Sequence, residues 1–404
     1  MALSFKYIGS DNITTVLIDS DLALYMANVA MVVTNACDPD PRVKNSARWL
    51  AEAGHSVTIH AYDRQHSSEK ESKVDGVLIS RYHLGKSPYG GLVKTALGLN
   101  KFTKKAISTI NNSKPDVIIC HDADTLEVGY SIKKSLGIPL VLDMHDLQHT
   151  WVLMPNPKSL FRRIVSRRMK KIFLKKLVNV DLIITSSGSI ENGKYPGFKE
   201  WLTSFGFEST VVENRPMEAV QIPQSKRDDW TVSHIGRIRD IDSIELLLAA
   251  IKIIPKNQRP KLLIAGDGTS WKKAKQKIEQ FSQEQKIEFE VRGPYRRKDL
   301  PNLLGETNVM YALYDPARGN INDGALPVKM FDAASFGIPT IVNSNCLMAE
   351  ICESEKLGIS VEWSNSQALA EALLSQRETR VKLVKTADEF REIYISKFHS
   401  LLEL

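Results

Sequence analysis

The sequence is poor in cysteine, with four in 404 residues: Cys37, Cys120, Cys346 and Cys352. They form no CxxC pair and no Cys/His cluster at metal spacing, which favours a reducing compartment and argues against a structural zinc site. The sequence also lacks an uninterrupted apolar run near the ~20 residues that span a bilayer. Asp19 and Asp21 interrupt the first hydrophobic stretch, so no signal peptide is predicted and we expect a cytoplasmic protein.

Composition and charge are otherwise those of a folded protein with one basic half. Hydrophobic residues make up 43% and charged residues 25% of the sequence, which excludes wholesale disorder, and 404 residues suffice for two or three domains. The net charge of +7 comes from residues 1–215, with 28 Lys and Arg against 21 Asp and Glu, because residues 216–404 carry 26 of each. We therefore expect the first half to face a phosphate-bearing or membrane-borne partner.

Short β-branched runs alternate with helical patterns along the chain, which is typical of parallel sheets with crossover helices. The first unit is a strand at Val29–Thr34, a helix from about Arg42 to Ala53 that ends at Gly54, and a strand at Ser56–Ala61. We predict an α/β fold of two tandem doubly wound, Rossmann-like domains with a ligand cleft between them. The predicted segments are an N-terminal extension of unknown role (1–27), a first domain (28–215), a polar linker (216–229), a second domain (230–375) and a C-terminal helix (376–404).

The second half carries groups suited to a nucleotide diphosphate. Such a ligand needs fixed positive charge and unpaired backbone N–H groups, which occur together at helix N-termini that follow a tight strand-to-helix turn. Gly236 and Arg237 offer a close backbone approach and a guanidinium, and Lys329 offers an ammonium in the first turn of its helix. Asp332 lies one turn after Lys329 on the same helix face and can accept hydrogen bonds from ribose hydroxyls.

Several short motifs follow one another in a recognisable order. In the first half they are DPRV at 40–43, GHSVT at 54–58, HDADTL at 121–126 and LVLDMHDL at 140–147. In the second half they are IGRI at 235–238, IAGDG at 264–268 and LPVKMFDAASFGIP at 326–339. Each motif alone is weak, but their order along roughly residues 28 to 400 resembles the retaining, nucleotide-sugar-dependent glycosyltransferases of family 4, which have the GT-B fold.

The resemblance implies a role for each matching position. Arg237 and Lys329 would bind the donor diphosphate and stabilise the departing negative charge, and His145 would lie close to the donor sugar and acceptor, so these three form the predicted catalytic set. The implied donor-binding set is Gly236, Arg237, Asp323, Gly324, Ala325, Leu326, Lys329 and Asp332. The implied acceptor-side set is Asp40, Arg42 and His121. The last helix would cross back to cover the first domain.

The sequence departs from the family pattern at two places. The family usually has two glutamates eight residues apart, whereas here Gly324, beside Asp323, stands at the first position and Asp332 at the second. The family also often has a lysine where this chain has Asp242. Backbone N–H groups around residues 323–326 could take over the contacts of the missing glutamate.

Two DxD strings, Asp122-Ala123-Asp124 and Asp38-Pro39-Asp40, are similar to the metal-binding motif of the other glycosyltransferase fold. Both lie in the first domain, away from the predicted donor site. We interpret them as loop residues and predict that no metal and no cofactor is required, because Arg237 and Lys329 already compensate the donor charge.

The segment Lys158–Lys176 contains nine basic residues, interleaved with apolar residues at helical spacing. A basic amphipathic helix of this kind suits an anionic membrane surface, although an ordinary surface helix would show the same pattern. The predicted membrane contacts are Arg162, Arg163, Arg167, Arg168, Lys170 and Lys171. Aromatic residues are sparse among these charges, so we do not expect nucleic acid as a partner.

The sequence therefore predicts an enzyme that transfers a hexosyl unit from a UDP or GDP sugar to a glycan or lipid-linked acceptor, with retention of configuration, at the inner face of the cell membrane. A non-catalytic, membrane-associated scaffold of the same fold is the main alternative, because the first glutamate is missing. A nucleotide-sugar 2-epimerase is a further alternative, but such an enzyme needs acidic and histidine groups around the donor that the sequence does not reveal.

Overall fold

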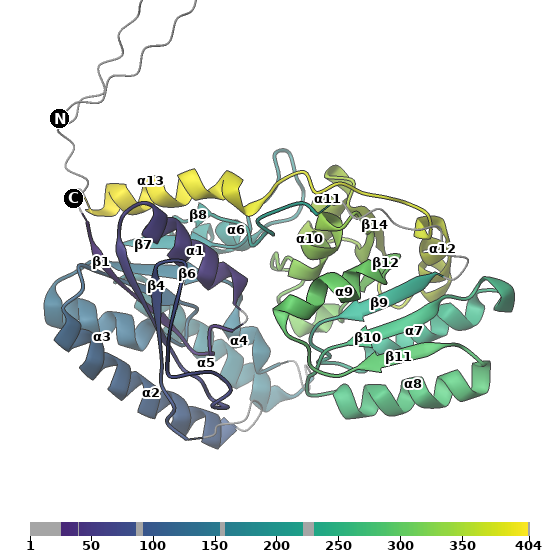
Figure 1. The fold of residues 1–404 in the computed structure, drawn as a ribbon, viewed down its shortest axis with the longest axis horizontal. Coiled ribbons are helices and arrows are strands. Elements are labelled where there is room, and N and C mark those ends of the chain that lie inside the picture. The colour runs from purple at the N-terminus through teal and green to yellow at the C-terminus, as the bar shows by residue number, and fades with distance from the viewer. Residues whose placement is uncertain (1–25, 39, 86–91, 154–157, 221–229, 403–404) are drawn as a thin grey trace, which may run out of the picture.

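The computed structural model describes residues 26–38, 40–85, 92–153, 158–220 and 230–402. Two parallel sheets, each between layers of helices, stand side by side, and the chain enters the second after completing the first (Figure 1). Most of the predicted N-terminal extension and of the predicted linker lies outside the described residues. None of the described helices combines the length and the apolarity needed to cross a bilayer.

The first sheet has eight strands in the order β3-β4-β2-β1-β5-β6-β7-β8. The strands are β1 (Asn28–Val33), β2 (Ser56–Ala61), β3 (Glu71–Val74), β4 (Val77–Arg81), β5 (Val117–His121), β6 (Leu140–Met144), β7 (Leu182–Thr185) and β8 (Thr210–Val211). The helices are α1 (Pro41–Glu52), α2 (Leu92–Ser113), α3 (Leu126–Leu136), α4 (Gln148–Trp151), α5 (Leu160–Leu177) and α6 (Phe198–Thr203). Neighbouring strands run parallel, apart from the antiparallel pair β3 and β4.

The second sheet has six strands in the order β11-β10-β9-β12-β13-β14. The strands are β9 (Thr231–Ile235), β10 (Lys261–Ala265), β11 (Phe289–Arg292), β12 (Val309–Ala312), β13 (Thr340–Asn343) and β14 (Gly358–Val361). The helices are α7 (Asp242–Ile253), α8 (Trp271–Gln285), α9 (Leu300–Gly305), α10 (Val328–Ser335), α11 (Leu347–Ser354) and α12 (Ser366–Gln376).

Local sequence signals explain where these elements begin and end. Asp40 precedes α1 and its side chain accepts a hydrogen bond from the Val43 N–H, while Pro41 occupies the first turn, where a missing N–H costs nothing. Gly137 ends α3 in the left-handed conformation that glycine adopts readily. The central strands β1, β5 and β6 are buried almost throughout, as expected for strands covered by helices on both faces.

The end of the chain returns to the first domain, as the family resemblance implied. After α12 the backbone crosses over the top of the molecule, and α13 (Arg391–Leu402) lies along the first domain beside α1 (Figure 1). Tyr394 and Phe398 of α13 are buried in the same core as Trp49, whose ring centre lies 5.7 Å from that of Tyr394. The α/β fold of two doubly wound domains is therefore confirmed, with one core shared between the first domain and the C-terminal helix.

Candidate active site

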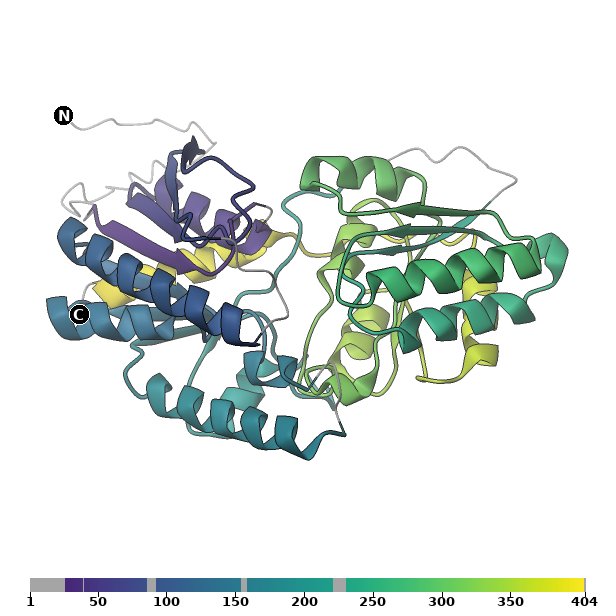
Figure 2. The ribbon, with the colours of Figure 1, turned by 90° about the horizontal axis from the view of Figure 1, so that it is seen from below.

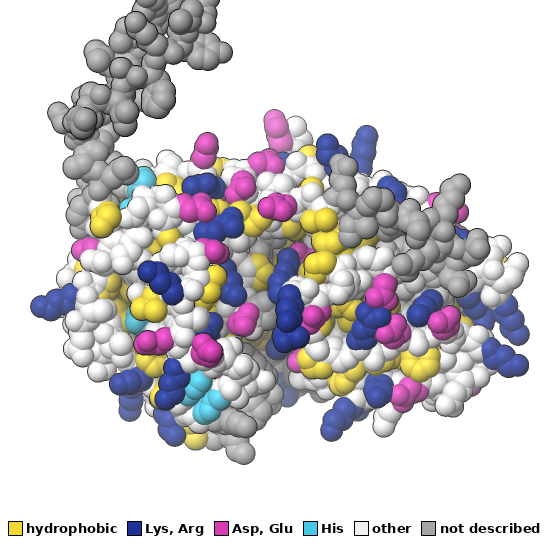
Figure 3. Space-filling view, viewed as in Figure 1, with side chains coloured by type: hydrophobic (Ala, Val, Ile, Leu, Met, Phe, Trp, Pro, Cys, Tyr) yellow, Lys and Arg dark blue, Asp and Glu magenta, His cyan; other side chains and the backbone are white. Residues whose placement is uncertain are grey.

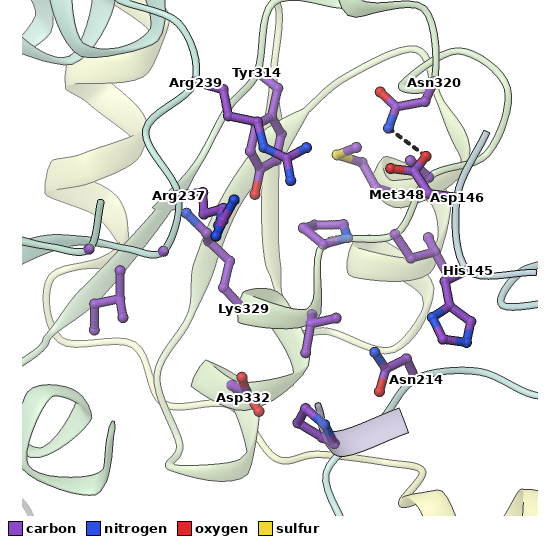
Figure 4. Close-up of a pocket in the computed structure, with 18 of the residues that line it drawn as sticks. His145, Asp146, Asn214, Arg237, Arg239, Tyr314, Asn320, Lys329, Asp332 and Met348 are labelled. Carbon is purple, nitrogen blue, oxygen red and sulfur yellow. Dashed lines mark hydrogen bonds between the residues drawn. The ribbon is translucent and has the colours of Figure 1, made fainter. Parts of the chain in front are cut away.

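A cavity of about 640 Å³ opens between the two domains, at the carboxyl ends of their strands. Figure 2 shows the two layered halves side by side, and Figure 3 shows a hollow in the molecular surface between them, with basic side chains at its edge. Pro41, His145, Asp146 and Asn214 line it from the first domain. The second domain contributes the larger share, including Gly236, Arg237, Arg239, Tyr295, Arg297, Tyr314, Lys329 and Asp332 (Figure 4).

The wall formed by the second domain depends on close backbone contacts. Gly236 follows β9 with a φ of +133°, and a side chain there would approach the Lys329 side chain. Gly266 follows β10, and a Cβ at this position would fall 1.9 Å from the Gly236 carbonyl oxygen. Two strand-end loops therefore pack backbone against backbone, which leaves room for a ligand to reach the main chain.

Arg237 and Lys329 both project into the cavity from this wall, as predicted (Figure 4). Lys329 lies in the first turn of α10, its Nζ 3.4 Å from His234 Nε2 and 5.6 Å from the ring centre of Tyr314. The Arg237 side chain is 47% exposed, with its Nε 3.7 Å from Asp267 Oδ1. Two cations and a helix N-terminus thus converge on one wall, an arrangement that suits a diphosphate.

Asp332 is held by a partner that the sequence did not reveal. The Arg297 guanidinium donates to both of its carboxylate oxygens, at 2.7 Å each. Each oxygen retains a lone pair that can accept from a ribose hydroxyl, so the predicted ribose role and the ion pair are compatible. Burial, together with the Asp332 charge, raises the pKa of the neighbouring Tyr295 to about 12.

The missing family glutamate has a steric explanation. Gly324 has a φ of +101°, and a Cβ at this position would lie 2.4 Å from the Cα of Gly197 in the first domain. The two domains therefore touch through glycine backbones where a longer side chain would keep them apart. Of the predicted loop, Ala325 and Leu326 line the cavity, whereas Asp323 and Gly324 are not among its described lining residues.

The first domain presents a buried charged network at the cavity. His145 follows β6, and its Nε2 lies 3.1 Å from His121 Nδ1 and 3.4 Å from Asp143 Oδ2, while its Nδ1 lies 3.7 Å from Asp122 Oδ2. Arg42 donates to the other oxygen of Asp143, with Nε at 2.9 Å. His145 faces the cavity with a 19% exposed side chain, but both of its ring nitrogens are turned toward this network.

The network shifts the pKa values of its members. Burial opposes the charge of Asp143, but Arg42, His145 and His121 together outweigh it and hold the pKa of Asp143 well below its usual range. Burial also opposes the imidazolium of His145, but Asp122 and Asp143 outweigh it and raise the pKa of His145. Burial raises the pKa of Asp122 to about 7, although the positive charge of His145 acts in the opposite direction.

The predicted acceptor-side residues lie behind the cavity wall. Asp40 caps α1, Arg42 is 5% exposed beneath Asp143, and His121 is 1% exposed at the end of β5. None of the three is among the described residues that line the cavity, so their part in acceptor binding stays a prediction.

The two DxD strings also have internal partners. Asp122 accepts from the backbone N–H of His145, and Asp124 accepts from the Thr34 hydroxyl at 2.5 Å. Asp38 pairs with Lys44 near the start of α1.

Sequence reasoning missed the contacts that join the two walls. Asn320 Nδ2 donates to Asp146 Oδ1 across the cavity at 2.9 Å (Figure 4). Asp146 also accepts from the indole N–H of Trp151. A polar residue next to the predicted histidine was visible in the sequence, but its partner lies 174 residues away and no local pattern points to it.

The basic segment forms α5, along the outer side of the first domain (Figure 2). Its C-terminal half packs on the domain through Phe173 and Leu177, and Lys170 lies over the rings of Trp201 and Phe205. Its N-terminal half instead exposes Leu160, Phe161 and Ile164, at 75%, 68% and 62%. The predicted basic contacts flank these residues; Arg163, Arg167, Arg168 and Lys171 are exposed, whereas Arg162 and Lys170 are partly buried.

Solved structures with this arrangement are glycosyltransferases. The sucrose-phosphate synthase of Thermosynechococcus elongatus is 16% identical and matches with a TM-score of 0.67 over 93% of this chain and 96% of that chain. Anabaena HepE in complex with UDP-glucose is 14% identical, with a TM-score of 0.61 over 93% of this chain and 100% of that chain. The catalytic domain of Arabidopsis thaliana starch synthase IV, bound to ADP and acarbose, is 12% identical, with a TM-score of 0.61 over 94% of this chain and 99% of that chain.

Family models agree with this fold. No curated protein sequence matches the chain. Residues 42–192 match the model described as Glycosyltransferase Family 4, and residues 218–390 match the one described as Glycosyl transferases group 1. The two matches follow one another along most of the sequence, one on each domain, and the chain belongs to the family 4 glycosyltransferases of the GT-B fold.

Proposed function

We propose that this glycosyltransferase moves a hexosyl unit from a nucleotide diphosphate sugar to a glycan or lipid-linked acceptor, with retention of configuration. The observation that carries the proposal is the convergence of Arg237, Lys329 and the N-terminus of α10 on one wall of the cavity. These groups neutralise the diphosphate and stabilise the negative charge that grows on it as the glycosidic bond breaks. They do so without a metal ion on the diphosphate.

We favour a uridine over a guanosine nucleotide as the donor. HepE is described in complex with UDP-glucose, and a Staphylococcus aureus TarM variant in complex with UDP. In this chain Asp332, oriented by Arg297, would accept from the ribose hydroxyls, and Ala325 and Leu326 would approach the sugar and phosphate.

The test is release of nucleotide diphosphate by the purified chain from a panel of UDP and GDP sugars, with and without lipid extract. Lys329→Ala should lower kcat/KM by about 10² to 10³, the effect of removing one donor to a developing charge. Lys273→Ala, on the exposed side of α8, is the matched control and should turn over normally. Anomeric analysis of the product by NMR then tests retention. Donor binding without turnover in every mixture would instead support the scaffold alternative.

We also propose that α5 holds the enzyme at the inner face of the cell membrane. The exposed apolar residues Leu160, Phe161 and Ile164 would enter the interfacial region, and the flanking cations would meet lipid phosphates. The protein should sediment with phosphatidylglycerol vesicles, and the Phe161→Glu variant should remain in the supernatant. Val74→Glu, at an exposed apolar residue of the edge strand β3, is the control. Equal retention of all forms on neutral and anionic vesicles would contradict the proposal.

A further inference from the structure

Three ligand atoms converge on one point behind the cavity wall. His121 Nδ1 and His145 Nε2 lie 3.1 Å apart, and each lies 3.4 Å from Asp143 Oδ2. The atoms come from the adjacent strands β5 and β6 and from the residue that follows β6 by one position. Within the described part of the chain this is the group whose spacing suits a metal ion.

Hydrogen bonds can fill this triangle only with an extra proton. With both imidazoles neutral, one proton shared by the two ring nitrogens leaves the lone pair of one nitrogen facing the Asp143 oxygen, and a second proton on His145 relieves this. His121 Nε2 is buried with no partner among the described residues, and it carries the N–H both when Nδ1 accepts a hydrogen bond and when Nδ1 binds a metal. That unpaired N–H therefore favours neither occupant.

A single divalent cation at the centre also suits the same three atoms. Zinc binds histidine nitrogen and carboxylate oxygen at about 2.0 to 2.2 Å in a tetrahedron, whose edges are then about 3.3 to 3.6 Å. The observed edges of 3.1, 3.4 and 3.4 Å therefore form nearly one face of such a tetrahedron.

The surroundings orient these three groups in the way that metal ligands are oriented. Arg42 fixes one oxygen of Asp143 and leaves the other turned to the triangle. Asp122 Oδ2 lies 3.7 Å from the outer nitrogen of His145, and Asp122 Oδ1 accepts from the His145 backbone N–H. A carboxylate behind a ligating histidine fixes its tautomer and adds negative charge, which offsets the positive charge of Arg42.

We propose that His121, Asp143 and His145 form a binding site for one divalent transition metal ion of the zinc type. Three protein ligands leave a fourth position open, and His145 is the ligand that borders the cavity. The site is separate from the groups that neutralise the donor, and it would stand if the proposed sugar transfer were wrong.

The experiment uses the full chain, freed of metal by a chelator, and two probes. Zn²⁺ is titrated calorimetrically, and Co²⁺ is added to record the visible absorption of a four-coordinate site. We expect one ion per chain and a rise in the unfolding temperature with Zn²⁺. His145→Gln should weaken Zn²⁺ binding by at least about tenfold and abolish the Co²⁺ band, because it removes a ligand. Asp122→Asn should weaken binding by about 10- to 100-fold while the band persists.

His83→Gln is the matched control, since His83 also faces a carboxylate, Asp63, at 3.2 Å but lies outside the triangle. It should leave binding and the Co²⁺ band unchanged. The partly exposed position of His145 makes that variant tolerable for folding, which circular dichroism verifies; the buried His121→Asn is a second test. Absence of saturable binding, or binding that survives both ligand substitutions, would overturn the proposal and leave a shared proton as the only occupant. Donor turnover, measured separately, fails or succeeds independently of this result.

Discussion

The two domains follow the same strand-helix plan but end their central strands differently at the cleft. In the second domain, Gly236 and Gly266 follow β9 and β10, and the cations Arg237 and Lys329 face the open cavity. In the first domain, β5 and β6 carry His121 and Asp143 at or near their ends, both buried and linked to other charged side chains.

The charged residues of the two domains therefore have different roles. Charges of the second domain that face the cavity are available to a ligand, so their loss should lower activity more than stability. Charges of the first domain are compensated inside the protein, so their loss should lower stability first. Four substitutions test the comparison.

The largest effect is expected for Arg42→Ala, which leaves the Asp143 carboxylate buried without its main partner. Removing one member of a buried ion pair costs about 3 to 5 kcal/mol of unfolding free energy. Chemical denaturation measures this loss of unfolding free energy. Arg48→Ala, on the same helix in a partly exposed pair with Glu52, should cost no more than about 1 kcal/mol. Equal losses for the two variants would break the comparison.

Acid should weaken the first domain before the second, because burial lowers the pKa of four of its histidines, His55, His60, His121 and His149. His145 acts in the opposite direction, because Asp122 and Asp143 raise its pKa. Burial lowers the pKa of His60 to about 4, against about 6.5 in an unfolded chain. Between these values the unfolded chain binds the proton and the folded chain does not, so stability falls as the pH drops from 6.5 to 4.

For His60 the loss amounts to at most about 3 kcal/mol. Thermal unfolding at several pH values should show a smaller slope for His60→Gln, and an unchanged slope for the exposed His66→Gln. A slope that is the same for wild type and His60→Gln would refute this assignment.

Gly324→Ala tests the glycine contact between the domains. The new Cβ would meet the Gly197 backbone, and the alanine would have to adopt an unfavourable positive φ. Together these would destabilise the closed arrangement by about 1 to 3 kcal/mol. We expect reduced turnover and a more open chain in small-angle scattering. Gly206→Ala also has a positive φ but no neighbour within 4 Å, so it separates backbone strain from contact. Similar scattering of both variants would argue against a role in closure.

The smallest effect is expected for Arg297→Ala. The substitution frees Asp332 from its two hydrogen bonds, and the carboxylate loses its orientation toward the donor. The KM for the nucleotide sugar should rise about tenfold, which corresponds to 1.4 kcal/mol, with little change in kcat. Arg296→Ala, at the exposed neighbouring position, should have no effect. A lower kcat at constant KM would place Arg297 in the chemical step instead.

Local patterns were enough to predict much of this molecule. The predicted strands at Val29–Thr34 and Ser56–Ala61 and the predicted helix from about Arg42 to Ala53 lie within one residue of β1, β2 and α1, because hydrophobic periodicity and a glycine stop mark them. The β3–β4 hairpin was missed, although Asp75-Gly76 between two strands is a readable turn signal and both residues have positive φ.

The partners of the site residues could not be predicted from the sequence. Arg42 meets Asp143 across 101 positions, and Arg297 meets Asp332 across 35. Such pairs are set by how strands and loops assemble in space, and no short-range spacing encodes them. The sequence therefore indicated the cations that line the cavity more readily than the residues that hold the other charged groups of the site.

The position of α13 has a consequence for how the chain folds as it leaves the ribosome. Ala387, Tyr394 and Phe398 complete the core beside α1, yet they follow the second domain in the sequence and are synthesised after it. The apolar surface around Trp49 therefore stays uncovered while the second domain is translated. A nascent chain that stalls before α13 emerges would be an aggregation hazard and a natural client for chaperones.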